Sequence, residues 1–286
     1  MTSDQPTALV TGANSGLGRA IAQALAVEGM RVGLVVRDRA RGEAALAAIR
    51  AASANPDLQL FVADLADQSA VHRLAESVLA RFERLDLLVN NAATAFPARR
   101  SSPDGIECAL AVNHLAPFLL TNLLLDRLLA SAPARIINVG TRIDTAMDFT
   151  DLNWERRPYR TLAAYGQSKL GNLHVTFELA RRLAGSGVTV NCLFPGVFRS
   201  NLGGTDGAQG LFWKLVGLLL GWALATPEQA AGHLLETART ADLAGVSGAY
   251  LGFRGPLRAP AQALDQAANR RLWEMSAALT GLATDT

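Results

Sequence analysis

The stretch that decides the fold stands at residues 8–18 and reads ALVTGANSGLG. Its first part, Ala8–Thr11, predicts a buried strand, and an amphipathic segment over Arg19–Glu28 predicts a helix after it. Between them the glycines follow the spacing Gly-x-x-x-Gly-x-Gly. Such glycines let the backbone approach a pyrophosphate, and a helix N-terminus offers free N–H groups and a positive dipole end. The stretch predicts a dinucleotide-binding turn, although a tight structural turn would use the same glycines.

Outward from this turn, short apolar runs alternate with longer alanine-rich segments. Five further runs read as buried strands: Val32–Val36, Leu58–Val62, Leu87–Asn90, Ile136–Val139 and Val188–Leu193. The segments between them predict helices over Arg41–Ala52, Ser69–Phe82, Gly105–Ala130 and Ala163–Gly185. This alternation predicts an α/β fold with a doubly wound parallel sheet and helices on both faces.

The last third of the chain alternates less regularly. It predicts helices over Leu211–Ala225, Pro227–Thr240 and Ala261–Leu279, and a strand over Ala249–Gly252. No linker or repeat divides residues 1–286, so we expect a single domain. Insertions beyond the carboxyl ends of such strands tend to cover the ligand crevice. The segment at about 200–226 is therefore expected to form an apolar lid.

Composition limits the classes of partner and the compartment. The formal net charge is +2 over 286 residues, which gives no electrostatic reason to expect a nucleic acid. Cys108 and Cys192 fit neither a metal site nor a disulfide framework, so we expect buried free thiols and no metal. Residues 1–6 do not resemble a signal peptide, and Leu211–Ala225 is too short to span a bilayer. We expect a cytoplasmic protein whose lid packs on the domain, although the same helix could touch a membrane surface.

The end of the second predicted strand bears on the choice of cofactor. In dinucleotide-binding folds an acidic side chain there binds the ribose 2′-hydroxyl of NAD, whereas an arginine accommodates the 2′-phosphate of NADP. Arg37 comes first after the strand. Asp38, twenty residues past Gly18, keeps the other choice open. The order of the two side chains favours NADP(H) over NAD(H).

A second motif carries the chemistry. Tyr165 and Lys169 lie four residues apart on a predicted helix, so their side chains share one face. Lysine occurs only at Lys169 and Lys214, against 25 arginines, which indicates a position that arginine could not fill. A neighbouring cation is expected to lower the pKa of a tyrosine from about 10, as a proton donor to a carbonyl requires. A surface tyrosine beside a snorkelling lysine is the alternative.

These motifs together resemble the short-chain dehydrogenases/reductases. The motifs that follow that family's order are Thr11–Gly18, Asn90–Ala93, Asn113, the Tyr165–Lys169 pair and Pro195–Gly196. Residues 165–202 and Leu272–Ser276 are similar to the retinol dehydrogenase branch. The resemblance covers nearly the whole chain. It implies a Rossmann-type fold and an oxidoreductase, with a homodimer or homotetramer as the common assembly.

The resemblance also implies roles for individual residues. Tyr165 would be the general acid/base, Lys169 would bind the nicotinamide ribose, and Asn113 would anchor a proton-relay water. Asp64 would contact adenine, and Ser200 the carboxamide region. The full set implied to bind the cofactor is Gly12, Asn14, Ser15, Gly16, Leu17, Gly18, Arg37, Asp64, Leu65, Asn91, Ala92, Ala93, Tyr165, Lys169, Pro195, Gly196, Val197 and Ser200.

The sequence departs from the family pattern at two places. Ala93 replaces the usual glycine after Asn-Asn-Ala. After Val139 the chain reads Gly140-Thr141, where the family places a serine that hydrogen-bonds the substrate carbonyl. Threonine keeps the hydroxyl and adds a methyl group, so we expect Thr141 to act in place of the serine. A weakened or altered site is the alternative.

The predicted function is an NADPH-dependent oxidoreductase that interconverts a lipophilic ketone or aldehyde and its alcohol. The expected substrate lining, Ile143–Phe149, Phe198–Leu202 and Leu211–Trp213, is mostly apolar. Two other functions stay open. One is reduction of a conjugated carbon–carbon double bond, which needs less polarisation by Thr141. The other is a nucleotide-binding regulatory protein without turnover.

Overall fold

Eight strands form one sheet in the computed structural model, which describes residues 5–142, 145–196, 226–239, 245–252 and 255–283. The strands are β1 (Thr7–Thr11), β2 (Arg31–Val36), β3 (Leu58–Val62), β4 (Leu87–Asn90), β5 (Ala134–Val139), β6 (Val188–Phe194), β7 (Ala249–Gly252) and β8 (Gly255–Pro256). Their order is β3-β2-β1-β4-β5-β6-β7-β8, and only the β7–β8 pair is antiparallel.

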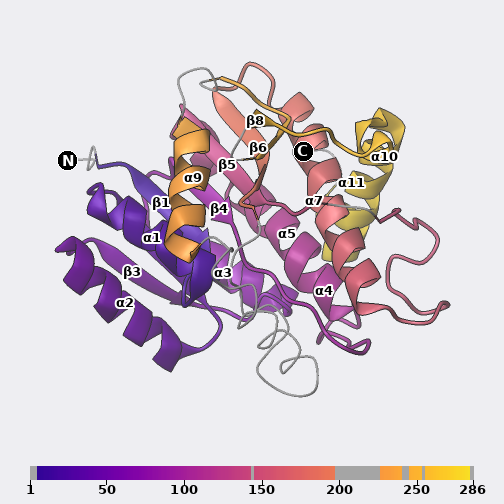
Figure 1. Cartoon of the computed structure of the whole chain (residues 1–286), viewed down its shortest axis with the longest axis horizontal. Coiled ribbons are helices and arrows are strands. Elements are labelled where there is room, and N and C mark those ends of the chain that lie inside the picture. The colour runs from indigo at the N-terminus through magenta and orange to yellow at the C-terminus, as the bar shows by residue number, and fades with distance from the viewer. Residues whose placement is uncertain (1–4, 143–144, 197–225, 240–244, 253–254, 284–286) are drawn as a thin grey trace.

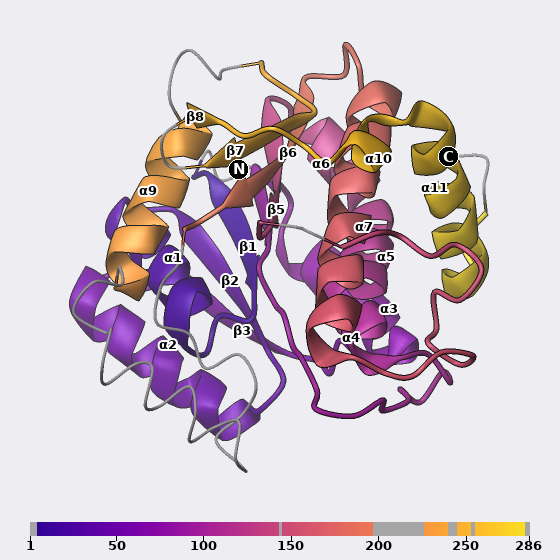
Figure 2. The ribbon, with the colours of Figure 1, turned by 45° about the vertical axis from the view of Figure 1, so that its right-hand side comes forward.

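Helices cover both faces of this sheet (Figures 1 and 2). The described helices are α1 (Gly16–Val27), α2 (Arg39–Ser53), α3 (Gln68–Arg81), α4 (Cys108–Leu110), the π-helical turn η1 (Ala111–Leu115), α5 (Ala116–Leu123), α6 (Leu125–Ala130), α7 (Thr161–Arg182), α9 (Pro227–Arg239), α10 (Ala261–Leu264) and α11 (Gln266–Thr280). Figure 2 shows α1, α2 and α9 on one face and α3, α5 and α7 on the other, with α11 outside α7. The predicted doubly wound parallel sheet is confirmed.

The sheet lies between two apolar layers because successive side chains of a strand point to opposite faces. In β1, Ala8 and Val10 pack into the layer with α1 and α9. Leu9, between them, packs into the layer with α3, α5 and α7. All five residues of β1 are buried, as expected for the central strand of a parallel sheet covered on both faces.

The single helix predicted over Gly105–Ala130 is wrong. The chain becomes helical at Cys108, after Glu107 accepts hydrogen bonds from the N–H groups of Ala109 and Leu110. It then widens into the π-helical turn η1 before α5 begins. Pro117 follows directly and has no N–H to donate to the Asn113 carbonyl four residues earlier. The missing donor is a local reason for the irregular turn.

The helix predicted over Ala261–Leu279 is also divided. Its first part ends at Leu264, and Asp265 begins α11 by accepting hydrogen bonds from the N–H groups of Ala267 and Ala268. An aspartate in this position caps a new helix instead of continuing the old one. The division lets α11 run along α7, which carries Tyr165 and Lys169.

Candidate active site

A cavity of about 1060 Å³ opens at the carboxyl edge of the parallel strands, at the upper end of ligand-pocket sizes. It spans the place where the strand order reverses, between β1 and β4. The described residues implied by the family resemblance that line it are Gly12, Asn14, Ser15, Gly16, Leu17, Gly18, Arg37, Asp64, Leu65, Asn91, Ala92, Ala93, Thr141, Tyr165, Lys169, Pro195 and Gly196. The sequence motifs therefore meet in one cavity.

The glycine turn is held tightly against the end of β4. A Cβ at Gly18 would lie 2.3 Å from the Gly12 carbonyl oxygen and 2.4 Å from Asn91 Nδ2. Asn91 Nδ2 donates to the Thr11 carbonyl at 2.8 Å. The Thr11 hydroxyl accepts from the backbone N–H groups of Asn91 and Ala92, at 2.9 and 3.0 Å. These contacts fix the glycine turn against the end of β4, and only a glycine fits at position 18.

The start of α1 is suited to an anion. Ser15 stands at the N-cap position with extended backbone, and its side chain makes no capping hydrogen bond. The first N–H groups of a helix that lack a side-chain cap can bind phosphate oxygens, aided by the helix dipole. The geometry therefore fits the pyrophosphate of a dinucleotide.

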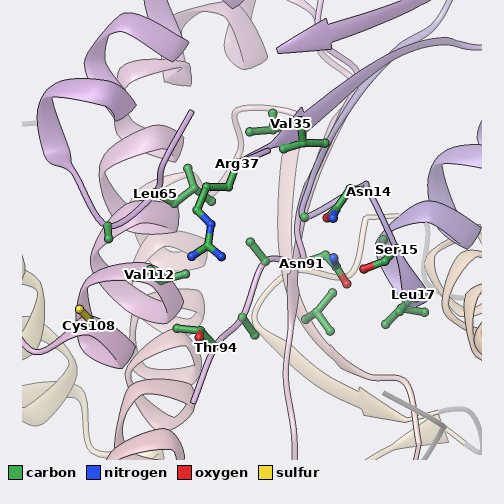
Figure 3. A pocket seen from close by; sticks show the side chains of 18 of the residues that line it. Asn14, Ser15, Leu17, Val35, Arg37, Leu65, Asn91, Thr94, Cys108 and Val112 are labelled. Atoms are coloured by element: carbon green, nitrogen blue, oxygen red, sulfur yellow. The ribbon is translucent and has the colours of Figure 1, made fainter. Parts of the chain in front are cut away.

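Two neighbouring side chains of opposite charge end β2. Figure 3 shows Arg37 directed into the cavity, with Leu65 and Val112 on one side and Asn14 and Asn91 on the other. The Asp38 carboxylate instead accepts a hydrogen bond from the Arg41 N–H at 2.8 Å and caps α2. Arg37 and Asp38 both line the cavity, but one carboxylate oxygen of Asp38 is engaged in the cap of α2.

Several lining residues lie outside the set that the family resemblance implied, although Asp38 was considered in the choice of cofactor. Those beyond the predicted set are Val35, Val36, Asp38, Arg41, Ala63, Ala66, Thr94, Phe96, Arg100, Ser101, Ser102, Pro103, Cys108, Val112, Val139, Gly140, Arg142, Phe194 and Pro227. Cys108 and Val112 lie across the cavity from Asn91 (Figure 3). Their spacing of four residues on a helical stretch predicts a shared face, but the same spacing is typical of core residues, so it did not identify them.

Tyr165 and Lys169 lie on consecutive turns of α7 and both line the cavity. Lys169 is only 2% exposed, and its ammonium donates to the Val139 carbonyl at 2.9 Å. Burial lowers the pKa of Lys169 to about 8. The Tyr165 hydroxyl has no hydrogen-bond partner among the described residues, and it is free to meet a substrate.

The expected lowering of the Tyr165 pKa is wrong. Burial raises the pKa of Tyr165 to about 12. The Lys169 ammonium is bound to the Val139 carbonyl, and desolvation of the phenolate outweighs any attraction to that cation. Tyr165 is therefore protonated at neutral pH.

Thr141 faces the same cavity, half-buried beyond the end of β5. Its backbone carbonyl accepts from the Tyr250 hydroxyl at 2.6 Å. Packing requires glycine at the preceding position, because a Cβ at Gly140 would lie 2.6 Å from Cys192 Sγ.

Cys108 and Cys192 are both buried free thiols, as predicted. The described residues contain no group of His, Cys, Asp or Glu that could hold a metal.

Asn113 lies behind the cavity and does not line it. It is fully buried in η1, and its side chain accepts from the Thr94 N–H at 2.7 Å. The same side chain donates to the Thr94 carbonyl at 2.9 Å and to the Ser168 hydroxyl at 3.0 Å. Its role in anchoring a relay water stays a prediction.

Part of the expected substrate lining packs elsewhere. Met147 is buried in the core under α7, and its N–H donates to the Gln262 side chain at 2.9 Å. The Phe149 ring packs against His174 and Arg271, on the side of α11. For these two residues the prediction is wrong, because Gln262 ties the segment to α10. Val197, Ser200, residues 198–202, residues 211–213 and nearly all of the predicted lid lie outside the described residues.

The described helices include none that is both long enough and apolar enough to cross a membrane.

The chain is similar to a family model, to curated proteins and to solved structures. A family model described as short chain dehydrogenase matches residues 6–209. Retinol dehydrogenase 13 of Homo sapiens is 43% identical over 289 residues, covering 96% of this chain and 85% of that protein. An uncharacterized protein from Mycobacterium paratuberculosis has a TM-score of 0.77 and 30% identity, covering 100% and 99% of the two chains. A short chain dehydrogenase from Burkholderia cenocepacia, solved in complex with NADP, has a TM-score of 0.66 and 28% identity, covering 86% and 95%.

Proposed function

Because the chain belongs to the short chain dehydrogenase family, we propose that it is an NADP(H)-dependent oxidoreductase that interconverts a lipophilic ketone or aldehyde and its alcohol. One observation carries the proposal. Tyr165, whose hydroxyl has no hydrogen-bond partner in the described part of the chain, and Thr141 line the same cavity as the glycine turn. Proton donor, carbonyl-binding hydroxyl and nucleotide turn therefore share one space.

The cavity fits a nicotinamide dinucleotide. The start of α1, where the Ser15 side chain makes no capping hydrogen bond, would bind the pyrophosphate, and Arg37 would hold a 2′-phosphate. Lys169 would contact the ribose next to the nicotinamide. The bound nicotinamide supplies or accepts the hydride. The Burkholderia relative, crystallised with NADP, supports the choice of cofactor.

Thr141, Tyr165 and Lys169 would bind the carbonyl oxygen and transfer the proton. The Thr141 hydroxyl would hold the carbonyl oxygen, and Tyr165 would donate a proton to the same oxygen as it becomes an alcohol. With its pKa raised to about 12, Tyr165 carries the proton that reduction needs. The lysine ammonium would stabilise the phenolate left behind.

A lipophilic substrate is supported by the likeness to retinol dehydrogenase 13 and by Phe96 and Phe194 in the cavity wall. The cytoplasmic location, the expected lack of nucleic-acid and membrane contact, and a homodimer or homotetramer stay predictions from the sequence.

Turnover of a panel of hydrophobic aldehydes and ketones with NADPH, followed by nicotinamide absorbance, tests the proposal. Tyr165→Phe should lose at least about 10²-fold in kcat, the scale of general acid catalysis, while NADPH still binds. Thr141→Ser should stay active, and Thr141→Val, which keeps the shape without the hydroxyl, should not. An active Tyr165→Phe variant would overturn the assignment of the proton donor.

Product analysis separates the competing functions. An alcohol supports the proposal, whereas a saturated ketone from a conjugated substrate identifies a double-bond reductase. Tight NADPH binding without turnover of any carbonyl compound identifies a regulatory protein.

A further inference from the structure

A buried stripe of polar side chains lies on α7 behind the cavity. Ser168, Asn172 and Thr176 follow one another at intervals of four residues, so they share one face of the helix. All three are buried. None lines the cavity, so the proposed reaction does not use them directly.

The middle residue of the stripe, Asn172, binds the backbone carbonyl of Asn113. Asn172 Nδ2 donates to the Asn113 carbonyl oxygen at 2.7 Å. That carbonyl cannot be satisfied by the N–H four residues ahead, because Pro117 stands there. Asn113 is 0% and Asn172 4% exposed, so water does not replace this contact at low cost.

From Asn113 the contacts continue to the cavity. The Asn113 side chain accepts a hydrogen bond from the Thr94 N–H and donates one to the Thr94 carbonyl. Thr94 lines the cavity wall. The Asn113 side chain also donates to the Ser168 hydroxyl, which in turn donates to the Tyr165 carbonyl at 2.7 Å. Asn172 is therefore connected to two walls of the site, through Thr94 and through the backbone of Tyr165.

The other end of the stripe is fixed to the sheet. The Thr176 hydroxyl donates to the Asn172 carbonyl at 2.7 Å and accepts from Asn138 Nδ2 at 2.9 Å. Asn138, in β5, accepts from Asn90 Nδ2 in β4 at 2.9 Å. The position of Asn172 is thus set by the ends of the same strands that border the cavity.

We infer that Asn172 is a positioning residue for the proposed reaction. By holding the Asn113 carbonyl, it fixes the Asn113 side chain, which in turn sets the distance between Thr94 and the α7 turn that carries Tyr165. The inference rests on the proposed function. Misplacement of reacting groups by about 1 Å can cost about 10²-fold in rate, so loss of this contact should reduce kcat more than binding.

Asn172→Leu removes the donor at similar size, and Asn55→Leu is the matched control. Asn55 is also a buried asparagine that donates to backbone carbonyls, those of Ala26 and Met30, but it does not line the cavity. Asn172→Leu should lower kcat between about 10-fold and 100-fold, with KM and the NADPH Kd within about twofold of wild type. Asn55→Leu should lower stability and leave kcat unchanged.

A second readout does not need turnover. Amide hydrogen exchange of the peptide containing Thr94 should speed up in Asn172→Leu and stay unchanged in Asn55→Leu, because the Thr94 N–H donates to the Asn113 side chain. Ser168→Ala should also lower kcat, and the double variant should lose less than the product of the two single losses, since both residues act through Asn113.

Equal kcat in the two asparagine variants, unchanged exchange at Thr94, or losses that simply multiply would each overturn the inference. A different result would contradict the proposed function itself: the wild-type protein would bind NADPH but turn over no carbonyl compound.

Discussion

At the end of β2, the neighbours Arg37 and Asp38 differ in charge and in what their side chains contact. The Asp38 carboxylate accepts a hydrogen bond from the Arg41 N–H at the start of α2. The Arg37 side chain is directed into the cavity (Figure 3). A carboxylate engaged in capping a helix is less available for a ribose hydroxyl, whereas a guanidinium in the cavity suits a phosphate.

Arg37→Ala should therefore raise the NADPH Kd by roughly tenfold, as expected for loss of one charge-assisted hydrogen-bonding group, and leave the NADH Kd nearly unchanged. Fluorescence titration with both cofactors measures this. Arg39→Ala is the control, because Arg39 pairs with Glu43 on the surface and does not line the cavity. A variant that keeps its preference for NADPH would contradict the role of Arg37.

Single residues also show what the sequence could and could not predict. Tyr165 and Lys169 were identified from spacing, and the structure brings both to the cavity. The raised pKa of Tyr165 could not be predicted, because it depends on burial by distant segments. From the sequence, Phe149 was expected to line the substrate site. Its packing against His174 and Arg271 depends on tertiary contacts that the sequence pattern does not show.

Among the elements, the turn between β1 and α1 has the tightest geometry. Gly18→Ala would place a methyl group 2.3 Å from the Gly12 carbonyl oxygen, and backbone cannot move aside at low cost. We expect it to weaken NADPH binding and to reduce the free energy of unfolding by about 1–3 kcal/mol.

Urea unfolding and NADPH titration check this expectation. Gly232→Ala, in α9, is the control, since a Cβ there meets no atom within 4 Å. If Gly18→Ala and Gly232→Ala had the same free energy of unfolding and the same NADPH Kd, the close packing of the turn would contribute neither to stability nor to binding.

Helix boundaries were harder to predict than the existence of the helices. The alternation of strands and helices predicted the sheet, because apolar periodicity depends on local sequence. The interruption at η1 has a local reason in Pro117, but the Asn113 carbonyl within it also accepts a hydrogen bond from Asn172 of another helix. A single helix was predicted there because periodicity does not register such a contact.

On the scale of the whole molecule, buried histidines of η1 and α7 contact the C-terminal helix α11. His114 Nε2 lies 2.8 Å from Ser276 Oγ of α11, and His174 Nδ1 lies 2.5 Å from Asn269 Oδ1 of the same helix. Burial lowers the pKa of His114 to about 4 and also lowers the pKa of His174. Both rings are therefore neutral when α11 is docked at neutral pH.

This burial predicts a loss of stability in weak acid. The unfolded chain binds a proton at His114 below its ordinary pKa of about 6.5, while the folded protein does so only near pH 4. Unfolding therefore takes up protons between these values. The free energy of unfolding should fall as pH decreases through this window, by up to about 3 kcal/mol from His114, and be fully retained above it.

Urea unfolding at several pH values from 7.5 to 4.5, roughly the span of this window, measures the slope. His114→Gln should reduce the slope, whereas His72→Gln, an exposed histidine of α3, should not change it. Equal slopes in the wild type and in His114→Gln would exclude this histidine as the source.

The cavity borders segments from both sides of the strand-order reversal, with Gly12 and Arg37 on one side and Thr141 and Lys169 on the other. A dinucleotide lying along it would join the two halves and bind only the folded chain. By mass action, ligand at 100 times its Kd adds about 2.7 kcal/mol to the stability of a protein. The supply of cofactor would then govern the lifetime of this protein in the cell as well as its rate, and starvation for the nucleotide would shorten its half-life.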